Sequence, residues 1–78
     1  MKISYGDHFL KHIGKVPEKQ QAKLSKLVVL LSENPFHPLL HTKSLSGDFS
    51  GLFSFRITRD WRVLFQFVSP DEIILADV

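Results

Sequence analysis

The sequence predicts an α+β fold in which a small antiparallel β-sheet packs against an N-terminal αα-hairpin, in the order β-α-α-β-β-β. Apolar residues within 18–33 recur with the i, i+3, i+4, i+7 spacing of an amphipathic helix. Across residues 52–68 they alternate with a period of two, as in strands that bury one face. Residues 72–78 are apolar on both faces, which is typical of a strand inside a sheet.

The N-terminus is expected to form a short strand followed by a short helix. Residues 2–5 predict the strand. Asp7 is expected to cap the helix, whose apolar stripe includes Phe9 and Ile13. Gly14 is expected to end this helix in a left-handed conformation, since glycine has no Cβ to oppose a positive φ.

A second helix is expected to begin at Pro17. Proline is favoured in a first helical turn, and the carboxylate of Glu18 suits the positive end of the helix dipole. The helix should end near residues 32–34, because Pro35 disfavours helical geometry in the residue before it. Two helices joined by so short a connection form an αα-hairpin.

Two strands with aromatic faces follow a loop that is rich in glycine, proline and serine. The faces expected in the core consist of Phe53, Phe55 and Ile57 in the first strand and Trp61, Val63, Phe65 and Phe67 in the second. The opposite faces contain one arginine each, Arg56 and Arg62. Both guanidinium groups are therefore expected to point away from the core.

Parity restricts how these strands pair. Their apolar faces match only when paired residue numbers add to an even total, so we expect an odd loop centred on Asp60, with Ile57 opposite Val63. Arg56 and Arg62 then become diagonal neighbours, roughly 7–8 Å apart, within reach of one phosphate group. The hairpin is thus a candidate phosphate-binding surface.

A second interpretation of the two arginines remains open. Exposed charges usually have no chemical role, and these side chains are then solvated or pair with Asp48, Asp60 or Glu72. The loop histidines His37 and His41 also have two possible interpretations, a pair of metal ligands or ordinary loop residues. In a proline-interrupted loop without a nearby third ligand, we expect ordinary loop histidines and no metal site.

Composition limits the class of protein. With 78 residues the chain is expected to be a single domain, 1–78, and it contains no cysteine, which excludes disulfides and thiolate metal sites. No apolar run is long enough to span a membrane, and the N-terminus lacks the apolar region of a secretory signal. We therefore expect a cytoplasmic protein.

Charge is unevenly distributed although the net charge is only +2. Residues 1–32 contain six lysines, of which Lys15, Lys19, Lys23 and Lys26 recur at near-helical spacing. Such a stripe fits contact with nucleic acid, and it equally fits the solvated face of an amphipathic helix.

Residues 44–65 resemble a known family. The pattern Leu45-x-Gly47, then Gly51 followed five positions later by Arg56-Ile57, then Arg62-Val63-Leu64-Phe65, is similar to the RelE/ParE superfamily of bacterial toxins, in its RelE, YoeB and YafQ branch. The predicted order of elements also fits that family. The resemblance covers essentially the whole chain and is strongest in this segment.

The resemblance implies a toxin of a type II toxin–antitoxin system, neutralised by a cognate antitoxin. Similar toxins cleave messenger RNA in the ribosomal A site, without a metal or another cofactor, by attack of a ribose 2′-hydroxyl on the adjacent phosphate. By this resemblance Arg62 would stabilise the transition-state charge, Arg56 would hold the RNA backbone, and Lys43 would accept a proton or stabilise charge. Arg59 and His41 would add RNA contacts.

One departure from the family changes this expectation. Active relatives continue past the last strand with a basic residue and a histidine or tyrosine, whereas this sequence ends at Val78. The resemblance therefore implies either a truncated form of the chain or a degenerate member of the family, with nuclease activity reduced or lost. The alternative is a binding module without nuclease activity, either a ParE-like inhibitor of DNA gyrase or an inert toxin that still binds antitoxin. The nuclease hypothesis requires Arg56, Arg62 and Lys43 to share one concave face.

Overall fold

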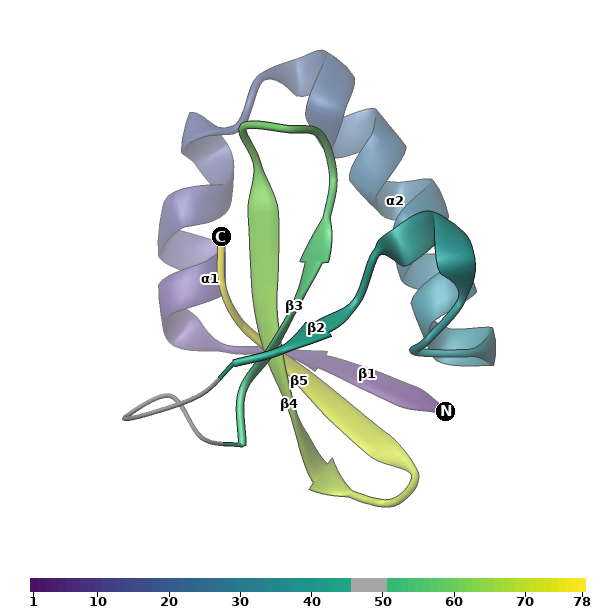
Figure 1. Cartoon of the computed structure of the whole chain (residues 1–78). Coiled ribbons are helices and arrows are strands. Elements are labelled where there is room, and N and C mark those ends of the chain that lie inside the picture. Colours follow the sequence, from purple (N-terminus) through teal and green to yellow (C-terminus); the bar gives the residue numbers. More distant parts are fainter. Residues whose placement is uncertain (46–50) are drawn as a thin grey trace.

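The computed structural model of the chain describes residues 1–45 and 51–78 (Figure 1). Two residues named above lie outside the described ranges: Gly47 of the expected loop, and Asp48, one of the possible partners of the arginines. The elements are β1 (Lys2–Tyr5), α1 (Asp7–His12), the 3₁₀ helix η1 (Ile13–Lys15), α2 (Glu18–Glu33), the 3₁₀ helix η2 (Pro38–Leu40), β2 (Lys43–Ser44), β3 (Phe53–Arg56), β4 (Arg62–Ser69) and β5 (Glu72–Asp77).

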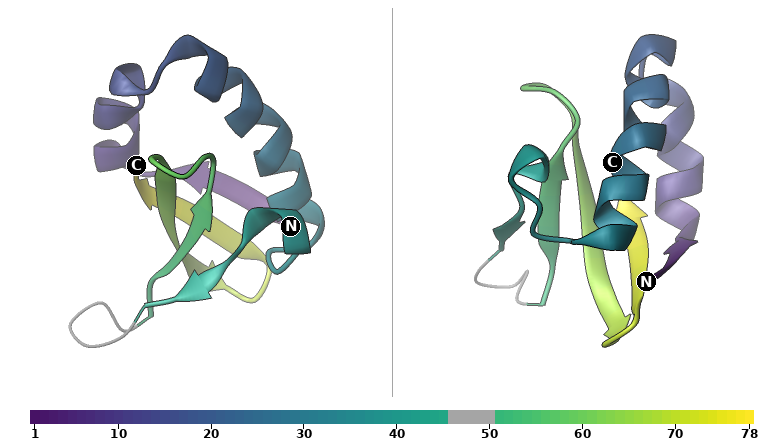
Figure 2. Two further views of the ribbon diagram at one scale, coloured as in Figure 1. Left: turned by 45° about the horizontal axis from the view of Figure 1, so that its top comes forward. Right: turned by 90° about the vertical axis from the view of Figure 1, so that its right-hand side faces the viewer.

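The strands form one sheet in the order β1-β5-β4-β3-β2. β1 runs parallel to β5, and the other neighbouring pairs are antiparallel. Both helices lie on one side of the sheet (Figure 2, right). The predicted α+β class and order of elements are confirmed. The sheet is mixed, however, and it contains the short strand β2, which the sequence did not predict.

The first helix begins and ends differently from the prediction. Gly6, not Asp7, is its N-cap, and no side chain caps it. The Gly6 N–H donates to the carbonyl oxygen of Leu75 at 2.8 Å, and a Cβ at Gly6 would lie 3.0 Å from that same oxygen. Close packing against β5 therefore determines where the helix starts. Gly14 is not left-handed, because the helix continues into η1.

The second helix confirms the prediction, since it ends at Glu33 and buries Leu24, Leu27 and Leu31. The Gln21 side chain secures the turn that precedes it. Its Nε2 group donates to the carbonyl oxygens of Ile13 at 3.1 Å and Val16 at 2.8 Å. This side chain satisfies acceptors that the irregular turn would otherwise leave unpaired. Within the described residues, no helix is long and apolar enough to cross a membrane.

The core lies between the helices and the aromatic face of β3 and β4. The predicted alternation is confirmed, because Phe55, Val63 and Phe65 are almost completely buried and Trp61 packs against them. Phe65 lies 5.5 Å from Phe53, ring centroid to ring centroid, in a stacked arrangement. The face with the arginines is thereby fixed on the other side of these strands.

The hairpin register has the predicted parity but differs by two residues. Phe55, rather than Ile57, lies opposite Val63, and the loop is centred on Arg59. The cause is the turn, in which the Ile57 N–H donates to the Trp61 carbonyl oxygen at 2.9 Å. Parity determines which faces match, whereas the turn determines which even register forms.

Candidate anion-binding site

Arg56 and Arg62 lie directly opposite each other on β3 and β4. Directly paired residues have Cβ atoms about 4.5–5.5 Å apart, closer than the predicted diagonal arrangement. Among the described residues neither arginine forms an ion pair, so pairing with Asp60 or Glu72 is not found. Two like charges this close repel each other, and an anion bound beside them would offset that repulsion.

A pocket of about 550 Å³ opens beside this pair, between α2, η2 and the tip of the β3–β4 hairpin. Among the described residues it is lined by Lys23, Leu27, Leu39, His41, Arg56, Ile57, Thr58 and Arg59. Within ranges 1–45 and 51–78, the lining contains three cationic side chains and one imidazole but no carboxylate. A pocket with this lining favours anions over cations.

The pocket exists because β2 is short. As far as the structure describes the chain, it pairs with β3 only at Phe53 and Ser54, and the edge of β3 at Phe55 and Arg56 carries no strand. The segment before β2 turns back towards α2 instead. Two contacts hold that segment: Leu40 is fully buried, and the Thr42 hydroxyl donates to the Pro35 carbonyl oxygen at 2.6 Å.

Arg56 contributes a buried donor to the pocket. Its Nε atom is buried and has no hydrogen-bond partner among the described residues. A buried donor left without an acceptor costs about 1–3 kcal/mol. An anion in the pocket could accept from Nε and from a terminal nitrogen of the same guanidinium, the paired geometry that suits phosphate oxygens.

The structure brings together some of the predicted site residues and separates others. Arg56, Arg59 and His41 line the pocket. Arg62 lies opposite Arg56 but does not line it, and Lys43 lies opposite Ser54 in β2 and also stays outside it. The register nevertheless puts Lys43 and both arginines of the facing pair on one face of the sheet.

Lys23 is the cation that sequence reasoning did not assign to the site. It was predicted only as a member of the lysine stripe, because its place in the pocket depends on how α2 packs across the hairpin tip. The two loop histidines also have separate roles. His37 accepts the Leu39 N–H through Nδ1 at 3.1 Å and so caps η2, whereas His41 faces the pocket. Within the described residues no three metal-binding side chains gather.

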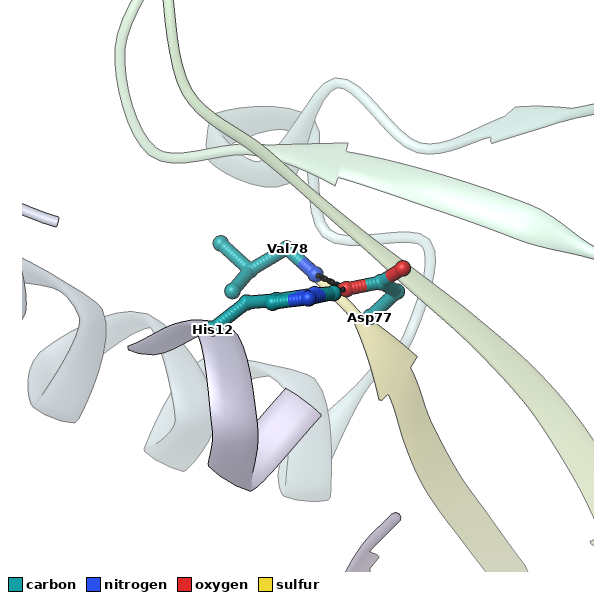
Figure 3. Close-up of polar contacts among 3 residues, drawn as sticks. All are labelled: His12, Asp77 and Val78. Carbon is teal, nitrogen blue, oxygen red and sulfur yellow. Dashed lines mark hydrogen bonds and ion pairs between the residues drawn. The ribbon is translucent and has the colours of Figure 1, made fainter. Parts of the chain in front are cut away.

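A polar contact outside the pocket, between α1 and the end of β5, was not predicted. His12 Nδ1 and Asp77 Oδ1 are 2.7 Å apart, and the Val78 N–H donates to the same oxygen at 2.8 Å (Figure 3). The hydrogen bond with His12, followed by the one from Val78, lowers the pKa of Asp77 below its usual 3.8. The contact joins residues 65 positions apart, which no local pattern reveals.

This contact predicts a small, pH-dependent loss of stability in Asp77→Asn. Because the folded-state pKa of Asp77 is lowered, the carboxylate stabilises the fold above the ordinary value of 3.8, and this contribution is lost as pH falls through the lowered pKa. The pair is about one-third exposed. We therefore expect the substitution to lower the free energy of unfolding at neutral pH by about 0.2–1 kcal/mol.

Urea denaturation near neutral pH and in acid measures this difference. It should shrink in acid for Asp77→Asn. The control Asp71→Asn removes an exposed carboxylate that forms no ion pair among the described residues, and it should show little change at either pH. A deficit in Asp77→Asn that is equally large at both pH values would contradict the assignment.

Comparisons with known proteins give the fold a context. No protein-family model matches the sequence, and no curated protein matches it. Among solved structures, a YoeB/ParE toxin from Agrobacterium tumefaciens is 21% identical with a TM-score of 0.80, over 99% of this chain and 94% of that one. YafQ from E. coli is 19% identical with a TM-score of 0.80, over 97% and 88%.

A third similar structure is the YoeB–YefM toxin–antitoxin complex from Staphylococcus aureus, at 18% identity and a TM-score of 0.78, over 99% of this chain and 92% of that one. Identities this low establish a shared fold and no shared activity. The fold that the resemblance implied is thereby confirmed: this chain has the fold of the RelE/ParE toxins.

Proposed function

We propose that this protein is the toxin of a type II toxin–antitoxin system and cleaves messenger RNA on the ribosome. The observation that supports this most is the pocket at the hairpin tip, where, among the residues that the structure describes, Nε of Arg56 has no partner and the cationic lining contains no carboxylate. The structural neighbours are toxins, and this likeness supports a nucleic-acid phosphate as the anion. Because ribosomes are cytoplasmic, so is the proposed activity.

The proposed chemistry matches the charges available. When a ribose 2′-hydroxyl attacks the neighbouring phosphate, negative charge accumulates on the phosphate oxygens, and fixed cations stabilise it. Arg56 would bind two of these oxygens, while Arg59 and Lys23 add positive charge along the lining. Arg62, directly opposite Arg56, would contribute to the field from the neighbouring strand.

We further propose a cognate antitoxin as the partner. The staphylococcal YoeB was solved with YefM, and E. coli YafQ was solved with DinJ. In this chain an apolar groove of about 250 Å³ lies between the two helices, lined by Tyr5, Phe9, Gln21, Leu24, Ser25 and Val28. Three lysines of the stripe, Lys19, Lys23 and Lys26, lie on α2, which forms one wall of the groove. An acidic amphipathic segment would match both features.

Translation in vitro tests the nuclease proposal. Messenger cleavage is mapped by primer extension after adding the purified chain to translating ribosomes, with the same messenger free in solution as the control. We expect cleavage on the ribosome and none of the free RNA. Absence of cleavage by a folded chain would contradict the proposal, and inhibition of gyrase supercoiling by the same preparation would then favour the binding-module alternative.

A further inference from the structure

His41 is the imidazole of the pocket that is free to exchange a proton. Of the histidines, His12 is engaged with Asp77, and His37 is engaged with the Leu39 N–H. The ring of His41 forms no hydrogen bond with the residues that the structure describes, and it lines the same pocket as Arg56. Both ring nitrogens are therefore available to a bound ligand.

The backbone at His41 is held in an unusual conformation. With φ of 51° and ψ of 44°, His41 is the one non-glycine residue in the described ranges 1–45 and 51–78 that adopts a left-handed conformation. Its N–H donates to the Pro38 carbonyl oxygen at 3.3 Å, and its neighbours Leu40 and Thr42 are both anchored. Strained backbone that its surroundings hold in place is concentrated at functional sites.

Lys43 is the competing candidate for proton transfer, and the structure favours His41. Lys43 lies in β2, opposite Ser54, and does not line the pocket. His41, in contrast, lines the pocket together with Arg56. Position in the fold therefore separates the two candidates.

We propose that His41 is a catalytic residue that accepts the proton of the attacking 2′-hydroxyl, an inference that rests on the proposed nuclease function. As the O2′–P bond forms, the proton passes to the imidazole. The P–O5′ bond then breaks, and the leaving 5′ oxygen takes a proton from water. The products are a 2′,3′-cyclic phosphate and a 5′-hydroxyl end, and the resulting hydroxide deprotonates the imidazolium.

The substitution His41→Gly tests this assignment, because glycine adopts the left-handed conformation without strain and leaves space for free imidazole. We expect cleavage to fall by about 10²–10⁴-fold and to recover in part when imidazole is added. Recovery should follow the unprotonated fraction of imidazole as pH is varied. The matched control His8→Gln alters an exposed histidine on α1, outside the pocket, and should cleave like the wild type.

Binding of a messenger with a 2′-deoxy nucleotide at the cleavage site separates proton transfer from RNA contact. We expect His41→Gly to bind this analogue on ribosomes like the wild type. Weakened binding with no rescue by imidazole would make His41 an RNA contact and overturn the proposal. Unchanged cleavage by His41→Gly would also overturn it and leave the nuclease function standing, whereas a wild-type chain that does not cleave would overturn both.

Discussion

Replacing Arg56 with alanine is expected to reduce messenger cleavage on ribosomes by about 10²–10³-fold, the usual loss when one donor to a transition-state anion is removed. Arg56 is the cation of the pocket whose Nε is buried and unpaired among the described residues, so it is positioned before the substrate binds. A donor held in place needs no reorganisation when charge develops on the phosphate. Single-turnover cleavage, followed by primer extension, measures the effect.

Two further variants distinguish geometry from charge. Arg56→Lys keeps the positive charge but loses the planar pair of donors, so we expect it to recover little of the lost rate. Lys43→Ala removes an exposed cation from the same sheet face but outside the pocket, and we expect only a small effect. Equal losses of cleavage rate in Arg56→Ala and Lys43→Ala would mean that cleavage depends on the overall positive charge of this face rather than on the pocket.

The local patterns of the sequence predicted most of the fold because they depend on neighbouring residues. Helical spacing identified α2, Pro35 indicated its end near Glu33, and alternation identified the buried faces of β3 and β4. The errors occurred where contacts between backbone segments that are distant in sequence determine the structure. The first helix starts where Gly6 packs on Leu75, and the hairpin register follows from hydrogen bonds between Ile57 and Trp61. Hydrophobic parity permits several registers and cannot choose among them.

In the candidate site, too, residues close in sequence were predicted and residues brought in by packing were not. Arg56, Arg59 and His41 were predicted because they lie in or beside the segment that resembles the toxin family. Lys23 could not be assigned to the site in this way, since it comes from a helix that is distant in sequence and reaches the pocket only through packing. β2 also escaped prediction, because its two residues contain no alternation, yet its shortness leaves open the edge of β3 where the pocket forms.

A second large effect is expected from Phe65→Ala, which should lower the free energy of unfolding by about 3–5 kcal/mol. Phe65 is completely buried, and its ring centroid lies 5.5 Å from that of Phe53 and 5.9 Å from that of Phe55. Small domains are stable by only about 5–15 kcal/mol. The substitution would therefore remove a large part of the free energy of unfolding of this 78-residue chain. Urea denaturation gives the value directly.

Phe36→Ala provides the matched comparison, because Phe36 belongs to the same aromatic cluster but is 58% exposed. It loses aromatic contacts without opening a cavity, so we expect about 0.5–1.5 kcal/mol. Similar losses in the two variants would contradict the view that burial of β4 supports the fold. Because β4 also pairs with the strand that carries Arg56, we expect Phe65→Ala to lose cleavage by unfolding, and conditions that restore its fold should restore cleavage. Arg56→Ala should remain inactive under the same conditions, since its defect is chemical.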